Sequence, residues 1–119
     1  MDLSNFNTQN VTDMSFMFFF SYISELDLSH FNTKNVTNMS GMFGSCLYLR
    51  SLNLSNFNTQ KVTDMSQMFH DCGKLESLDL SSFNTQNVTN MAGMFVNCRE
   101  IKRINLSSFN TEKVKDMCV

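Results

Sequence analysis

Apolar residues recur along this chain in the same order at steps of 25 or 26 positions. The triplet Phe-Asn-Thr begins at Phe6, Phe31, Phe57, Phe83 and Phe109. A valine lies five residues after each of these phenylalanines, and a methionine lies three residues after each valine. Self-similarity at a fixed period of about 20–50 residues indicates a repeat protein, in which each unit stacks on the next.

Two kinds of apolar spacing follow one another within each unit, as the third copy shows. Leu52 and Leu54 alternate with polar residues, which is typical of a short, half-buried strand. Further on, apolar residues at three- and four-residue intervals predict one face of a helix. They are Val62, Met65, Met68, Phe69 and Cys72. We expect a helix of roughly two turns that begins after Asp64 and ends near Cys72–Gly73.

The residue before the first helical methionine is always Asp or Asn. This column consists of Asp13, Asn38, Asp64, Asn90 and Asp116. Both side-chain types accept a hydrogen bond from the N–H groups of a first helical turn. The column therefore predicts a helix N-cap at the same place in every unit.

These patterns together predict an α/β repeat with one short strand and one short helix in each coil of 25–26 residues. Residues 1–119 form a single array of units 2–26, 27–52, 53–78 and 79–104, with a partial unit 105–119. One coil buries nine apolar side chains, worth about 1.5–3 kcal/mol each for the larger ones. Ordering each residue of the backbone costs about 1–2 kcal/mol, so we expect the coils to fold only as a stack.

Composition excludes several classes of function. The formal net charge is −2, and Lys and Arg are scattered rather than gathered into a stripe for nucleic acid. The two histidines fall at different repeat positions, so no Cys–His or Ser–His pair is indicated. Glycine-rich phosphate loops and the close Cys or His pairs of a zinc site are missing. We therefore expect no enzyme, no cofactor and no metal.

The cysteines follow the repeat, because Cys46, Cys72 and Cys98 share one column. We expect them to be buried free thiols, because equivalent positions on neighbouring coils should exceed the ~7 Å Cα separation that a disulfide allows. Cys118 lies outside the column, and we expect it to be exposed.

The segment Met14–Ile23 differs from its siblings in its aromatic content. It is far shorter than the roughly 20 apolar residues that span a membrane. Phe16, Phe19 and Phe20 stand where the other units place mostly small or polar residues. We expect these three rings to cover the open N-terminal end, by folding over it or by packing on a preceding coil or a second chain.

One column of the strand segments is polar and turns away from the core, because side chains alternate along a strand. It consists of Asp2, Asp27, Asn53, Asp79 and Asn105, beside a variable column of Glu25, Ser51, Ser77 and Arg103. We call this surface the sheet face. Our ligand-binding candidates on it are Asp27, Asn53, Asp79, Asn105, Glu25 and Arg103. Alternatively, the interleaved Asn residues only relieve repulsion between stacked carboxylates.

The repeat also resembles a known family. The segment LRSLNLSNF (Leu49 to Phe57) fits the leucine-rich repeat pattern, and NTQKVTDMSQMF after it resembles the BspA-like repeats of bacterial surface antigens. That resemblance covers almost the whole chain. It implies a right-handed, leucine-rich-type solenoid, adhesion to host proteins or other cells, a cell-surface or secreted location, and no catalytic residues.

We therefore expect a non-enzymatic adhesion or protein-binding module that presents the sheet face to a protein or cell-surface ligand. The alternative is a structural spacer or a self-assembling surface array that associates through its open ends. The chain carries no signal or anchor motif and opens and closes within a unit. These features favour a fragment of a longer array or a short, open-ended member.

Overall fold

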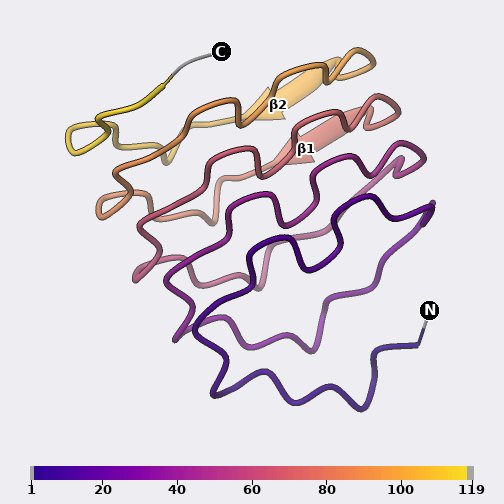
Figure 1. Ribbon diagram of the computed structural model, residues 1–119, viewed down its shortest axis with the longest axis horizontal. Helices are drawn as coiled ribbons and strands as arrows, with labels where there is room; N and C mark the ends of the chain where they lie inside the picture. The colour runs from indigo at the N-terminus through magenta and orange to yellow at the C-terminus, as the bar shows by residue number, and fades with distance from the viewer. Residues whose placement is uncertain (1, 118–119) are drawn as a thin grey trace.

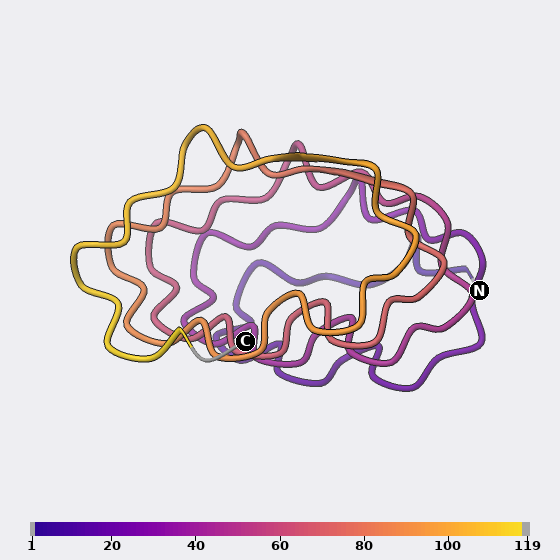
Figure 2. The ribbon, with the colours of Figure 1, turned by 90° about the horizontal axis from the view of Figure 1, so that it is seen from above.

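The computed structural model describes residues 2–117 and shows a stack of flattened coils, one for each sequence repeat (Figure 1). Seen from above in Figure 2, successive coils follow nearly the same path around a shared interior. The whole molecule measures 37 × 34 × 22 Å. Over the described range, no helix is long and apolar enough to cross a membrane.

The regular strands are confined to the C-terminal half of the stack. Strand β1, Ser77–Asp79, pairs in parallel with β2, Arg103–Asn105. Ser77 lies beside Arg103, and Asp79 lies beside Asn105. The equivalent segments of the earlier coils keep the alternation of buried and exposed side chains without forming named strands.

The prediction of a helix in each coil is wrong. Residues 2–117 contain no α-helix, so the chain is not an α/β repeat of the strand-and-helix, leucine-rich type. Instead, alternate N–H groups of one coil donate to carbonyl oxygens of the next. In the third coil, the donors Met65, Gln67, Phe69 and Asp71 lie 2.8 to 3.0 Å from the oxygens of Asn90, Ala92, Met94 and Val96.

Successive turns explain why the apolar spacing imitated a helix. Met68 N–H donates to the carbonyl of Met65, and His70 N–H donates to that of Gln67. Each such turn returns the chain to the core after three or four residues, which is also the period of a helical face. The backbone at Gln67 and Asp71 is left-handed, with φ of 55° and 57°, and a right-handed helix cannot continue through such residues.

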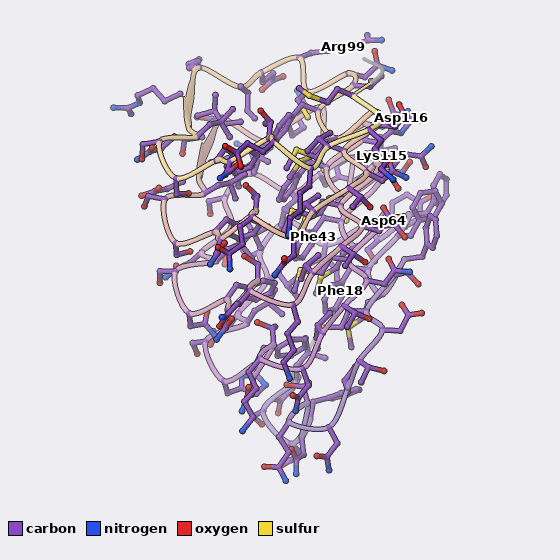
Figure 3. The ribbon with its side chains drawn as sticks, turned by 90° about the vertical axis from the view of Figure 1, so that its left-hand side faces the viewer. Phe18, Phe43, Asp64, Arg99, Lys115 and Asp116 are labelled. Atoms are coloured by element: carbon purple, nitrogen blue, oxygen red, sulfur yellow. The ribbon has the colours of Figure 1, made fainter. Side chains whose placement is uncertain are left out.

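The Asp or Asn column before each methionine fixes a turn and caps no helix. Asp64 Oδ1 accepts hydrogen bonds from Ser66 N–H at 2.8 Å and from Ser66 Oγ at 2.6 Å. Asp13, Asn38 and Asn90 each accept from the N–H two residues on. The backbones of this column also form isolated parallel bridges from coil to coil. Figure 3 shows Asp64 and Asp116 along one side of the stack.

Replacing Asp64 with alanine is expected to lower the free energy of unfolding by about 0.5–2 kcal/mol, the range for a lost side-chain-to-backbone bond of this kind. Asparagine at position 64 should be nearly neutral, because Asn90 makes the same bond to Ala92 N–H at 3.0 Å. Urea unfolding of both variants measures this. If Asp64→Asn were as harmful as Asp64→Ala, the turn would not be what the side chain stabilises.

The core consists of columns that run the length of the stack. Phe43 stacks on Phe18 and Phe69 with ring centroids 5.8 and 5.7 Å apart and nearly parallel planes (Figure 3). The nine apolar positions expected in the third coil are confirmed as core: eight are buried, and Leu52 is partly buried against them.

Polar side chains inside the stack join one coil to the next. The hydroxyl of buried Thr59 donates to Asn84 O at 2.9 Å and accepts from Asn84 N–H at 2.8 Å. Thr8, Thr33 and Thr85 make the same pair of bonds. Within residues 2–117, no buried side-chain nitrogen or oxygen lacks a partner.

The cysteine column also bonds from coil to coil. The thiols of Cys46, Cys72 and Cys98 are free, and each lies 3.1 Å from a carbonyl oxygen of the preceding coil. Burial raises the pKa of all three thiols, most strongly at Cys72. Cys118 lies outside the described residues.

Candidate functional site

The candidate residues of the sheet face are all exposed and lie in two groups. Glu25, Asp27 and Asn53 line a shallow hollow of about 410 Å³ with Leu26 and Ser51. Asp79, Arg103 and Asn105 line a second one of about 790 Å³, with Ser77, Leu78, Lys102 and Ile104. The first hollow carries two acidic residues, and the second adds Lys102 and Arg103 to Asp79. The sheet face therefore has an acidic region and a more basic region.

The Asp and Asn side chains of this surface are already engaged within their own coil. Asp27 Oδ1 accepts from Ser29 N–H, and Asp79 Oδ1 accepts from Ser81 N–H, both at 2.9 Å. Asn53 and Asn105 make the equivalent bonds at 3.0 Å. This column therefore forms turns that the fold requires, whatever else it contacts.

The bonds from Ser29 and Ser81 stabilise ionised carboxylates, so they lower the pKa of Asp27 and Asp79 below its ordinary value of 3.8. Their contribution to stability is present above pH 3.8 and is lost as pH falls through the lower folded value. A carbon-13 NMR titration should place both carboxyl midpoints below 3.8. The Ser29 and Ser81 amide shifts should move at the same midpoints. Midpoints at or above 3.8 would mean that the turns do not hold in solution.

Glu25 and Arg103 differ from the Asp and Asn column in having no such role. Within residues 2–117, neither side chain takes part in a hydrogen bond or ion pair. They occupy the same column in different coils, three coil steps apart, which is about 15 Å at the usual spacing of paired strands. Of the six candidates, these two are the ones left available for a ligand.

Among residues 2–117, the histidines outside the sheet face are paired singly and not as part of a larger ionisable cluster. His70 Nδ1 lies 3.2 Å from Asp71 Oδ2, and His30 Nε2 lies within hydrogen-bonding distance of the carbonyl of Leu3. Over the described part of the chain, no group of three or more His, Cys, Asp or Glu could hold a metal ion.

A second surface, which we call the aromatic face, was not predicted as a unit. It consists of Phe16, Phe19, Phe20, Tyr22, Leu47 and Tyr48, whose exposed fractions run from 41% to 71%. The sequence signal was the chain's only two tyrosines, which lie in equivalent stretches of the first two units. Their proximity in space results from the stacking of the coils.

Two rings of this face lie against the second coil. A Cβ added at Gly41 would come within 2.4 Å of the Phe16 ring, and one at Gly44 within 2.8 Å of the Phe19 ring. These rings therefore pack on the glycines that follow them in their columns. The expectation that Phe16 and Phe19 fold over the N-terminal end is corrected by this contact.

A protein-family model described as "Mycoplasma protein of unknown function, DUF285" matches residues 1–51 and residues 19–119. The two matches together span the whole chain. No curated protein and no solved structure matches this chain.

Proposed function

We propose that this chain, which belongs to the DUF285 family, is a non-enzymatic module that binds a protein ligand through its sheet face. The observation that supports the proposal is the exposed pair Glu25 and Arg103, which stand on a surface whose neighbouring side chains are already held by turns. The resemblance to BspA-like repeats supports adhesion as the role and a cell-surface or secreted location. An extended face built from stacked repeats is also the usual binding surface of such proteins.

The sheet face is suited to a protein ligand because much of it is ordered before binding. Side chains already fixed in a turn lose little freedom on association, which removes part of the entropic cost. Opposite charges about 15 Å apart favour a partner that carries a basic and an acidic group at a matching separation. The charges would give specificity, and the surface around them would supply contact area.

A phage-displayed library of random peptides, selected on the parent protein, tests this proposal. The enriched peptides should combine acidic and basic residues. Exchanging the two charges in Glu25→Lys with Arg103→Glu should weaken their binding at least about tenfold, as loss of good electrostatic contacts does.

Residues Lys34 and Glu112 offer a matched control. They are exposed, lie in one column of another surface and are separated by the same three coil steps. Lys34→Glu with Glu112→Lys should leave peptide binding unchanged. Equal loss from both exchanges, or no enrichment on the parent, would contradict binding by the sheet face. A lack of enrichment would favour the alternative that the chain is a structural spacer.

A further inference from the structure

We propose that the aromatic face is the contact through which two copies of this chain form a symmetric dimer. Tyr22 and Phe20 are 71% and 56% exposed, and the other four members are exposed by 41% or more. With about 200 Å² for a large side chain, the six together present on the order of 600 Å². An exposed apolar area of this size is at the upper end of what monomers expose.

The area matches what a self-contact needs. Two such faces pressed together would bury about 1,200 Å², which is the lower bound for specific protein interfaces. A symmetric contact uses the same patch on both subunits and closes at two copies. Phe16 and Phe19 pack on glycines of the second coil, so the aromatic face extends from the first coil along the side of the stack rather than over its open end.

The rings are held firmly enough to act as anchors. Phe16 packs edge-to-face on Phe19 at 5.4 Å between centroids, and Phe20 packs on Tyr22 in the same way at 5.9 Å. Tyr22 also meets Tyr48 of the next coil at 5.9 Å. Rigid, clustered aromatic side chains lose little entropy on association and dominate the energy of many interfaces.

The backbone conformation at Phe16 and Phe20 is one that bulky side chains rarely adopt. Their φ angles are 55° and 58°, in the left-handed region. The equivalent positions hold Gly41, Gln67 and Gly93, and Ser45, Asp71 and Asn97. Strained, exposed rings in place of small or polar residues indicate a role in contacting a partner.

Charge favours a second copy over a lipid surface. None of the six residues is charged, so a symmetric contact brings no like charges of the aromatic face together. A helix or patch that binds anionic lipid usually has Lys and Arg around its aromatic residues. Around the four members in the first coil, residues 2–33 carry Asp2, Asp13, Glu25 and Asp27 and no Lys or Arg, so the basic residues near the face, Arg50 and Arg99, lie only on the side of Leu47 and Tyr48.

Sedimentation velocity of the parent across the micromolar range tests the proposal, with charge placed in the face as the perturbation. Tyr48 is the position of choice because it is exposed and, among the aromatic rings of residues 2–117, packs against Tyr22 alone. The parent should dimerise. Tyr48→Asp and Tyr48→Lys should each associate at least tenfold more weakly alone, while an equimolar mixture should form a one-to-one heterodimer.

The control places a charge at the C-terminal end of the stack instead. There Met117 lines an apolar hollow of about 280 Å³ with Met91, Met94, Phe95, Leu106, Phe109 and Thr111. Met117→Lys should leave the dimer unchanged. Thermal melting checks that every variant folds, and Tyr22→Ser with Tyr48→Ser replaces the charged variants if they do not.

Several results would overturn the proposal. A parent that stays monomeric excludes the dimer, and one that instead sediments with neutral phosphatidylcholine vesicles assigns the aromatic face to lipid. A dimer that survives the Tyr48 changes but is lost in Met117→Lys assigns self-association to the end of the stack. The sheet-face charges Glu25 and Arg103 lie outside the aromatic face, so the peptide test of the proposed function is independent of these outcomes.

Discussion

Replacing Phe43 with alanine is expected to lower the free energy of unfolding by about 3–5 kcal/mol, the usual cost of truncating a buried aromatic side chain. Phe43 is completely buried and stacks between Phe18 and Phe69, at 5.8 and 5.7 Å. The cavity would therefore open between three coils rather than within one. Urea unfolding followed by far-ultraviolet circular dichroism measures the loss.

Phe20 provides the matched control, because it is the same residue type and is 56% exposed. Phe20→Ala should change stability by less than about 1 kcal/mol, as exposed substitutions usually do. Phe20 lies outside the hydrophobic core, so truncating its side chain opens no cavity there. Losses of equal size in the two variants would contradict the stacked phenylalanine core.

Thr59→Val is expected to lower the free energy of unfolding by about 2–4 kcal/mol, although it hardly changes the volume of the side chain. The hydroxyl of Thr59 is the partner of both the N–H and the carbonyl of Asn84. Removing it leaves the N–H and the carbonyl of Asn84 without this partner at a part-buried position, and each such group costs about 1–3 kcal/mol. Urea unfolding again measures the change.

The control for this substitution is Thr63→Val. Thr63 is exposed, and its hydroxyl makes a single, longer bond of 3.3 Å to Thr37 O. Its replacement should change stability by less than about 0.5 kcal/mol, because water can satisfy the carbonyl. Similar losses at positions 59 and 63 would mean that the threonine column does not join the coils.

Which side chains are buried was the feature of this fold that the sequence predicted best. A strict repeat forces each column into one environment, so Phe57, Met65 and Phe69 could be recognised as core from spacing alone. The same argument placed Asp79 and Asn105 on the outside, as the register of β1 and β2 shows. Column patterns carry this information whatever secondary structure the chain adopts.

Secondary structure could not be obtained from the same spacing. Two successive turns and two turns of helix both bring side chains such as Met65, Met68 and Phe69 to one side. What separates them is the left-handed residue within each turn, where Gly41 and Gly93 have φ of 59° and 63°. Glycine in that column was the signal, because it is the residue best suited to this conformation.

Side chains with two local uses were the other source of error. Asp64 was interpreted as a helix cap, but its bond to Ser66 N–H serves equally well in an isolated turn. The role of Thr59 and the gathering of Tyr22 with Tyr48 depend on which coil lies beside which, so neither follows from the pattern within one unit.

Neighbouring coils are joined by backbone hydrogen bonds, and no helix intervenes within residues 2–117. NMR scalar couplings across hydrogen bonds, in carbon-13- and nitrogen-15-labelled protein, test this arrangement directly. We predict couplings from the nitrogens of Met65, Gln67 and Phe69 to the carbonyl carbons of Asn90, Ala92 and Met94. A coupling from Phe69 nitrogen to the Met65 carbonyl, four residues back, would reveal a helix and contradict the account.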